Sequence, residues 1–179
     1  MKEIHLPLTE EEIASLHAGD GVLLSGVIYT ARDAAHKRMA QLIKEGKPLP
    51  FDLNGSVIYY VGPTPGDDRH LIGSAGPTTS SRMDVYTPKL LDLGLKATIG
   101  KGRRCEVVKE AIVRNKAIYF IAVGGAGALM SHCITSCETI AFDDLLSEAV
   151  RKLTVKDLPC FVGIDASGND IYDTKGSQL

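Results

Sequence analysis

The stretch Gly21-Val-Leu-Leu-Ser-Gly-Val-Ile-Tyr29, followed directly by Thr30-Ala-Arg-Asp33, indicates how this chain folds. Its first part is apolar and rich in β-branched side chains, which predicts a strand buried inside a sheet. Thr30 has the residue type of a helix N-cap, and Asp33 would lie in the first helical turn. The stretch therefore predicts a buried strand that leads straight into a helix packed against the sheet.

Strands and helices continue to alternate through the middle of the chain. Apolar, β-branched runs predict further strands over residues 2–6, 56–61, 71–74, 97–99 and 117–123. Residues 62–69, rich in proline and aspartate, are expected to form a loop. Helix-start signals at Thr9 and Thr87 predict two short helices. A longer helix is expected over residues 105–115, with its inward side chains at Val107, Val108, Ala111 and Ile112.

Strands dominate the last part of the chain. A part-helical segment is expected over residues 128–136, and a short helix or turn over residues 142–146. Residues 149–155 and 160–164 are predicted to pair as two strands joined by a turn at Lys156-Asp-Leu-Pro159. The carboxyl-terminal region is thus expected to extend the sheet without adding a large helix.

The composition fits a single soluble domain over residues 1–179, with a polar tail over 174–179 that is expected to fray. Apolar residues make up 44% of the chain and charged residues 23%, as in ordinary globular proteins. Combined with the order of elements, this predicts the α/β class in its mixed α+β form: a mixed sheet with helices packed on it. The net charge of −2 gives no reason to expect nucleic acid or an anionic membrane as partner.

The amino terminus carries no sign of export. Met1-Lys-Glu-Ile-His5 contains no apolar run, so no signal peptide is expected. The protein is therefore predicted to be cytoplasmic, with its four cysteines reduced. The most apolar stretch, residues 117–130, is too short to span a bilayer.

The stretch that indicates a function is Gly73-Ser-Ala-Gly-Pro-Thr-Thr-Ser-Ser-Arg82-Met-Asp84. Its glycines and proline predict an irregular turn, and a run of hydroxyl residues, Thr78–Ser81, precedes the arginine. Hydroxyl and backbone N–H groups in such a turn can hold an oxyanion, and arginine can bind a carboxylate with two hydrogen bonds. A surface turn that caps the next helix would have the same residues, so the choice depends on where the other cations fall.

Three cations, Arg32, Arg82 and Lys101, are expected just beyond the ends of strands or in the adjoining turn. Ligands usually bind at this edge of sheet-containing folds. The helix dipole disfavours a cation in the first helical turn, so Arg32 calls for an anion nearby. Each side chain alone could simply be solvated, but together the three favour a small polyanionic ligand.

Several other motifs are weaker indications of chemistry. Gly124-Gly-Ala-Gly127 lacks the full dinucleotide-binding pattern, and a lining of the ligand site or close backbone packing is the better interpretation. His132, Cys133 and Cys137 have no second pair of metal ligands, so no metal is expected. The lone histidines His36 and His70 are expected at the surface. Loop aspartates, expected to be solvated, are Asp67, Asp68 and Asp84, and none is an obvious base for the threonines.

The order and spacing of these motifs, from about Leu6 to Tyr172, resemble the β subunit or carboxyl-terminal domain of iron–sulfur class I fumarases and L(+)-tartrate dehydratases. The motifs that carry the resemblance are Ile28-Tyr-Thr-Ala-Arg-Asp-Ala-Ala-His36, Gly76-Pro-Thr-Thr-Ser-Ser-Arg-Met83, Gly100-Lys-Gly102, Gly124-Gly-Ala-Gly-Ala-Leu129 and the closing Ala149–Lys152 with Gly168-Asn-Asp170. The resemblance implies a swivelling β/β/α domain, with a mixed sheet or partial barrel and flanking helices.

The resemblance also implies an activity and a partner. These enzymes hydrate fumarate reversibly to (S)-malate, or dehydrate tartrate to oxaloacetate. Their [4Fe–4S] cluster, and an aspartate that pairs with the catalytic threonine, belong to the α portion. None of the four cysteines here matches a cluster ligand, so no cofactor is expected on this chain. The chain would be inactive alone and would pair with a separate α subunit, as a heterotetramer that could contain a homodimer of this chain.

Residue by residue, the resemblance assigns proton transfer to Thr78 and substrate binding to Arg32, Thr79, Arg82 and Lys101. The preferred hypothesis is that the chain is a fumarase β subunit, and the second is that it is a tartrate dehydratase β subunit. A third possibility, from another class, is a non-catalytic module that binds a dicarboxylate with the same cations. A purely structural role for the apolar middle of the chain is the fourth.

Overall fold

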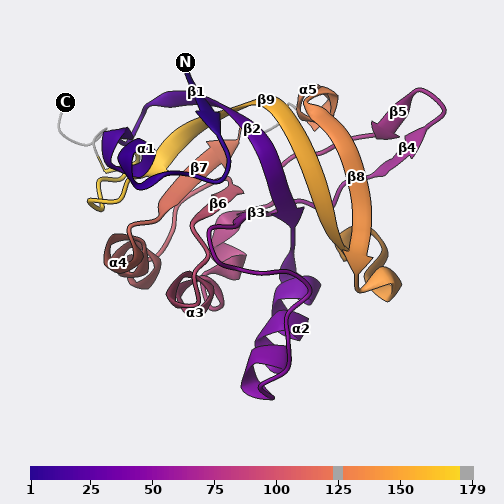
Figure 1. Cartoon of the computed structure of the whole chain (residues 1–179), viewed down its shortest axis with the longest axis horizontal. Coiled ribbons are helices and arrows are strands. Elements are labelled where there is room, and N and C mark those ends of the chain that lie inside the picture. The colour runs from indigo at the N-terminus through magenta and orange to yellow at the C-terminus, as the bar shows by residue number, and fades with distance from the viewer. Residues whose placement is uncertain (123–126, 174–179) are drawn as a thin grey trace.

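The computed structural model describes residues 1–122 and 127–173 (Figure 1). The predicted tail over 174–179 and most of the glycine motif, residues 124–126, lie outside these ranges. In chain order the elements are β1 (Lys2–His5), α1 (Glu10–Ser15), β2 (Gly21–Thr30), α2 (Asp33–Lys44), β3 (Val57–Tyr59), β4 (Pro65–Asp67), β5 (His70–Ile72), the 3-10 turn η1 (Ser80–Met83), α3 (Thr87–Asp92), β6 (Ala97–Gly100), α4 (Glu106–Asn115), β7 (Ile118–Ala122), α5 (Gly127–His132), β8 (Ile134–Ala141), η2 (Asp143–Glu148) and β9 (Val150–Ile164). Within the described residues, every helix is too short or too polar to cross a membrane.

Five strands form a closed barrel. β2, β3, β6 and β7 lie side by side in that order and run parallel, while β9 runs antiparallel to β7 and returns to pair with β2. β1 pairs with the first half of β2, along the edge whose far end pairs with β3. β8 joins β9, and β4 and β5 make a separate hairpin. The prediction of a mixed sheet or partial barrel with flanking helices is confirmed, and the barrel closes fully.

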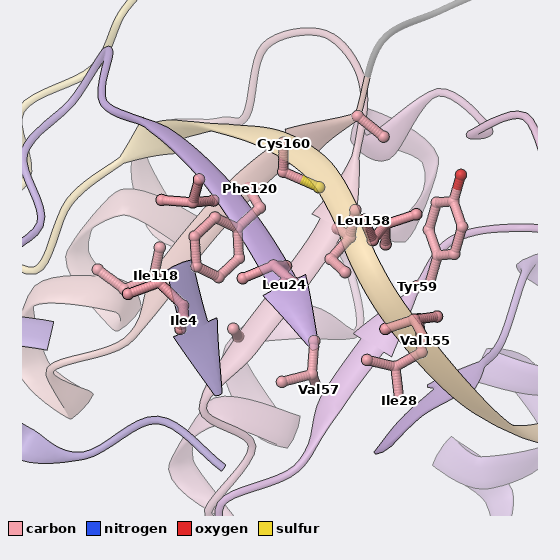
Figure 2. Close-up of a cluster of buried hydrophobic side chains, with 14 of the residues drawn as sticks. Ile4, Leu24, Ile28, Val57, Tyr59, Ile118, Phe120, Val155, Leu158 and Cys160 are labelled. Atoms are coloured by element: carbon pink, nitrogen blue, oxygen red, sulfur yellow. The ribbon is translucent and has the colours of Figure 1, made fainter. Parts of the chain in front are cut away.

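The side chains of the barrel strands alternate between two buried layers. On β3, Val57 and Tyr59 belong to the cluster inside the barrel, whereas Ile58 and the next residue, Tyr60, belong to the cluster beneath the helices. Figure 2 shows the inner cluster, where Leu24, Phe120 and their neighbours from other strands converge. Because both faces are buried, these strands are apolar at successive positions rather than at every second one.

Three helices, α2, α3 and α4, gather on one side of the sheet (Figure 1). On α4 the buried stripe consists of Val108, Ala111 and Ile112, which lie three and four residues apart as helical packing requires. Val107 was predicted to point inward, but it is 59% exposed, and its direction differs by about 100° from that of Val108.

The prediction of a hairpin over residues 149–164 is wrong, since β9 continues through the expected turn. Asp157 adopts a positive φ of 54°, opposite a shift of register between Leu24 and Gly26 on β2. The Asp157 N–H donates to Ser25 Oγ at 3.0 Å, which compensates for the interrupted pairing. The turn-forming residues therefore make a bulge that bends one long strand, as barrel closure requires.

Other boundaries differ from the sequence prediction. Thr30 is not the N-cap of α2; that position is Arg32, and Thr30 Oγ1 instead donates to the carbonyl of Ala149 and accepts from the N–H of Arg151. This pair of bonds ties the end of β2 to the start of β9. β8 was not predicted, and the loop expected over residues 62–69 contains β4. β4 pairs with β5 and β8 pairs with β9, so each strand is stabilised by its sheet partner rather than by the strand propensity of its own residues.

Gly26 provides a test of how tightly the barrel is closed. Its φ is +134°, and a Cβ at this position would lie 2.8 Å from the Cβ of Leu6. We expect Gly26→Ala to lower the free energy of unfolding by about 3 kcal/mol, from backbone strain and overlap together. Gly46→Ala, also at positive φ (+67°) but with no atom within 4 Å, should lose only about 1 kcal/mol. Equal losses in urea denaturation would show that the contact with Leu6 does not constrain the strand.

Candidate active site

The carboxyl ends of β2, β3 and β6 meet at one edge of the barrel, since these strands are neighbours and run parallel. Arg32 lies two residues beyond β2, Tyr60 directly follows β3, and Lys101 directly follows β6. This is the position at which open and closed parallel sheets present ligand-binding groups. The sheet therefore brings two of the predicted cations to a common edge.

The turn with the threonine run lies across the ends of β3 and β6. Thr78 N–H donates to the carbonyl of Tyr60 at 2.7 Å. Thr79 pairs with Lys101 in an isolated parallel bridge, and Ser80 N–H donates to the Lys101 carbonyl at 2.9 Å. Thr78 is half-buried and Thr79 exposed, so backbone pairing fixes the turn without burying either hydroxyl completely.

Asp33 connects the two arginines. The Arg82 guanidinium, carried by η1, donates to Asp33 Oδ2 at 2.9 Å, and an Arg32 nitrogen lies 3.8 Å from the same oxygen. The Nε of Arg32 is buried and has no partner within the described part of the chain. An unpaired buried N–H costs free energy, so Arg32 retains a donor that an acceptor such as a carboxylate would satisfy.

The structure thus brings all five predicted site residues to this edge in two sets. Arg32 and Arg82 are joined through Asp33, and the turn of Thr78 and Thr79 is joined to Lys101. η1 starts beside Thr79 and carries Arg82, so it links the sets. Close approach depends on Gly100, because a Cβ there would lie 2.0 Å from Ser80 Oγ. We call this group the strand-end site.

A buried guanidinium that the sequence analysis did not single out lies beside the strand-end site. Arg104 is 5% exposed and donates to Asp84 at 2.6 Å and to three hydroxyls, those of Tyr60, Thr87 and Thr98. Burial disfavours its charge, yet nearby Tyr60 and Asp84 outweigh burial and raise the pKa of Arg104. Asp84, predicted to be solvated, is therefore the counterion of a buried cation. The available signal was a cation placed just before a helix start, where it needs a partner.

His36 is buried, so its predicted surface position is wrong. It lies on the inner face of α2 beside Ala35, and its Nδ1–H donates to the Arg32 carbonyl at 2.8 Å. Its ring makes an edge contact with Tyr60, with 5.4 Å between ring centroids. Burial lowers the pKa of His36 to about 4, and the charge of Arg104 acts in the same direction. The imidazole is therefore neutral near pH 7 and supports the backbone of Arg32.

The remaining sequence motifs occupy other parts of the molecule. Cys133 Sγ lies 3.8 Å from the carbonyl of Leu129, and over residues 1–122 and 127–173 no set of three or more His, Cys, Asp or Glu side chains could hold a metal ion. Gly127, the one described residue of the glycine motif, accepts a hydrogen bond from Ala75 N–H at 3.0 Å. His70 is exposed, as predicted, and bonds Asp67.

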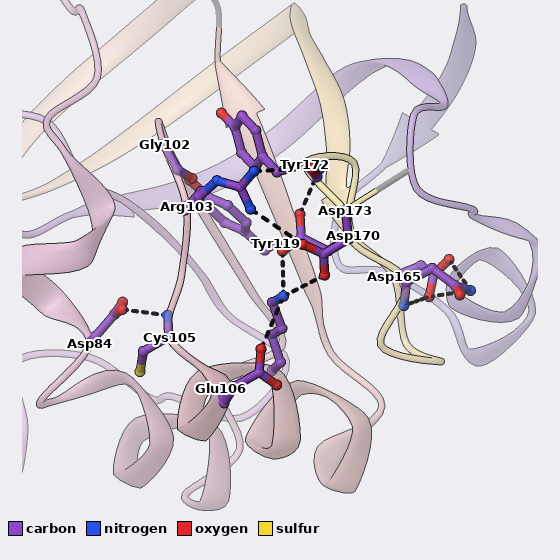
Figure 3. Close-up of polar contacts among 12 residues, drawn as sticks. Asp84, Gly102, Arg103, Cys105, Glu106, Tyr119, Asp165, Asp170, Tyr172 and Asp173 are labelled. Carbon is purple, nitrogen blue, oxygen red and sulfur yellow. Dashed lines mark hydrogen bonds and ion pairs between the residues drawn. The ribbon is translucent and has the colours of Figure 1, made fainter. Parts of the chain in front are cut away.

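A second polar cluster fixes the end of the described chain. Lys109 Nζ lies 2.8 Å from carboxylate oxygens of both Asp170 and Asp173, and Arg103 donates to the Tyr172 carbonyl at 3.1 Å (Figure 3). These carboxylates raise the pKa of Lys109 through hydrogen bonds. The cluster explains the motif that ends at Asp170 as an anchor to α4.

Two arginines, a lysine and a hydroxyl turn at one sheet edge are groups that can bind a small anion with more than one carboxylate or phosphate. The family described as Fumarase C-terminus matches residues 1–175, and the chain belongs to this family. The resemblance found in the sequence motifs is therefore confirmed.

Three relatives illustrate how the chain compares with known proteins. A Methanocaldococcus jannaschii protein, provisionally named as the β subunit of L(+)-tartrate dehydratase, is 37% identical over 178 residues, 96% of this chain and 91% of that protein. Fumarate hydratase 2 of Leishmania major is 35% identical over 164 residues, 90% of this chain and 29% of that protein. The anaerobic class I fumarate hydratase of Escherichia coli is 34% identical over 174 residues, 96% of this chain and 31% of that protein. The chain thus spans most of the first relative and less than a third of the other two, and all three carry names of hydro-lyases.

The buried imidazole predicts a specific loss of stability in acid. Unfolded His36, with a pKa near 6.5, binds a proton that the folded protein binds only near pH 4. The neutral imidazole therefore contributes its full share of the free energy of unfolding above pH 6.5. This share, about 3 kcal/mol in total, is lost as the pH falls from 6.5 through 4. In His36→Asn, whose amide can still donate to the Arg32 carbonyl, chemical denaturation from pH 7 to 4 should show a correspondingly smaller loss.

His5→Asn, at an exposed position on β1, is the matched control and should keep the slope of the wild type. If His36→Asn loses stability in acid as steeply as the wild type, titration of His36 does not contribute to the acid sensitivity of the fold.

Proposed function

We propose that this chain is the β-type half of a cytoplasmic hydro-lyase that reversibly hydrates fumarate to (S)-malate. The observation that carries the proposal is the strand-end site, where Arg32, Arg82 and Lys101 lie around the turn of Thr78. A C4 dicarboxylate has a carboxylate at each end of its reacting carbons. Cations on two sides of a proton-transfer group are the arrangement that such a substrate requires.

In this proposal each side chain has a defined role. The unpaired Nε of Arg32 and the guanidinium of Arg82 bind one carboxylate, and Lys101 binds the other. Thr79, exposed beside Thr78, supplies a further hydroxyl to the substrate. Thr78 Oγ1 transfers the proton at carbon, in a turn that its own N–H holds against Tyr60.

The proposal needs a second protein portion. The chain spans less than a third of the two fumarate hydratases compared above, and another relative is named as a β subunit. A threonine hydroxyl also needs a base to move its proton, and the aspartate next to the site, Asp33, is already paired with Arg82. We therefore assign the base, an aspartate, to a separate α subunit that joins this chain in a heterotetramer.

The cysteines of this chain do not suit an iron–sulfur cluster. Cys160 is buried in the barrel, Cys105 is exposed before α4, and Cys133 and Cys137 are half-buried on β8 or just before it. No three of them form a ligand set among the described residues. The proposal accordingly places the [4Fe–4S] cluster of class I enzymes on the α subunit, with no step of the chemistry assigned to a metal on this chain.

Replacing Thr78 tests the catalytic role. In the complex reconstituted with its α subunit, Thr78→Ala should lower kcat by about 10²- to 10⁴-fold, because proton transfer at carbon loses its group, and should leave KM nearly unchanged. Thr139→Ala, at an exposed position on the edge strand β8, is the matched control and should retain wild-type kcat. Full turnover by Thr78→Ala would assign the proton transfer to another residue. Robust turnover by this chain without an α subunit would contradict the proposal that a second subunit completes the site.

A tartrate dehydratase is the second candidate, favoured by the name of the relative that the chain spans almost entirely. The two substrates differ by one hydroxyl, so kcat/KM of the reconstituted complex for (S)-malate and for L(+)-tartrate decides between them. Binding of either dicarboxylate without turnover of either would instead identify a non-catalytic module.

A further inference from the structure

Tyr119, on the outer face of β7, connects the two turns of the strand-end site through its hydroxyl. The hydroxyl donates to the carbonyl of Gly102 at 2.8 Å (Figure 3) and lies 2.9 Å from Ser80 Oγ. Gly102 is the residue after Lys101, and Ser80 is the residue after Thr79. One oxygen atom on the barrel wall therefore contacts both turns at positions adjacent to the proposed substrate-binding residues.

The donors and acceptors at this junction are mutually consistent. Tyr119 has one hydroxyl proton, which goes to Gly102, so the hydroxyl of Ser80 must donate to the Tyr119 oxygen. Ser80 is fully buried and Tyr119 is inaccessible to solvent, so loss of either bond would leave a buried polar group unpaired. Burial raises the pKa of Tyr119, which keeps the hydroxyl protonated and able to donate.

The ring of Tyr119 is itself held in place. The guanidinium of Arg104 lies 4.8 Å from its centroid and 5.2 Å from that of Tyr60, whose carbonyl accepts from Thr78 N–H. Arg104 is fixed by Asp84, directly after η1. The Tyr119 hydroxyl thus sits on a rigid buried support. It joins the two turns between the Thr79–Lys101 bridge, which includes the bond from Ser80 N–H to the Lys101 carbonyl, and the contacts of Asp84 with Arg104 and Cys105.

We propose that Tyr119 is a positioning residue for the hydro-lyase reaction, whose hydroxyl sets the distance between the threonine turn and Lys101. This inference rests on the proposed function of the strand-end site, although the joining of the turns can be measured without it. Tyr119 does not touch the substrate; it acts through Ser80 and Gly102. Its loss should therefore affect turnover more than substrate affinity, because misplacement by a fraction of an ångström slows the chemical step.

The first test uses the reconstituted complex. Tyr119→Phe removes one oxygen and retains the ring, and it should lower kcat about 10-fold with KM changed less than about 3-fold. Ser80→Ala should give a similar loss, and the double variant should lose little more than either single variant, because both remove the same bond. Tyr29→Phe, whose ring stacks on Phe51 elsewhere, is the control and should match the wild type. Unchanged kcat in Tyr119→Phe, or losses that multiply in the double variant, would overturn the inference.

The second test needs no partner and no activity. In the full chain alone, amide hydrogen exchange at Ser80, whose N–H donates to the Lys101 carbonyl, should be about 10-fold faster in Tyr119→Phe than in the wild type. Exchange within β3 should stay the same, which also verifies that the variant folds. Unaltered exchange at Ser80 would refute the positioning role whatever the activity. If the wild-type complex has no hydro-lyase activity, the proposed function is refuted. The exchange rate at Ser80 then still decides whether the Tyr119 hydroxyl joins the two turns.

Discussion

Closure of the barrel by β9 is the constraint on which the rest of the structure depends. This strand pairs with β7 on one side and β2 on the other, so it fixes the curvature of the four parallel strands between them. The bulge at Asp157 bends β9 enough to make both pairings. With the parallel strands held in register, the ends of β2, β3 and β6 converge, and residues far apart in the sequence reach one edge. The helices α2, α3 and α4 bury the outer face beside that edge and leave the edge itself to the turns (Figure 1).

Local sequence was sufficient to predict most of the elements that build this frame. Apolar, β-branched runs identified β2, β3, β6 and β7, because strands that are buried on both faces have apolar side chains at successive positions. The same reasoning failed for β9, where Asp157 and Pro159 resemble a turn but form a bulge whose partner, β2, lies more than a hundred residues away in the sequence. It also failed for β8, an edge strand with mostly exposed or half-exposed positions, which is stabilised by its pairing with β9 rather than by an apolar sequence pattern.

The strand-end site was predictable to the extent that its residues follow strands directly. Arg32 and Lys101 satisfy that rule, and the turn of Thr78 was recognisable from its glycines and hydroxyls. The supporting layer was not predictable, because Arg104, Tyr119 and His36 act through contacts between distant elements. The position of Arg104 just before a helix start indicates that it needs a partner, but the partners themselves, Asp84 among them, come from other elements and are visible only in the structure. The family match identifies the family to which the chain belongs, and the support beneath the turns is what the structure adds.

The central claim is that one edge of the barrel holds a dicarboxylate through cations supplied by three chain segments. The most direct measurement is kcat/KM of the reconstituted complex for its dicarboxylate after replacing Arg32, Arg82 and Lys101 singly by methionine. Each replacement should lower kcat/KM by about 10- to 100-fold, the value of a charged hydrogen bond, and Arg114→Met, from an exposed ion pair with Asp92, should not. If all three variants keep the wild-type value, the dicarboxylate binds elsewhere and the account is wrong.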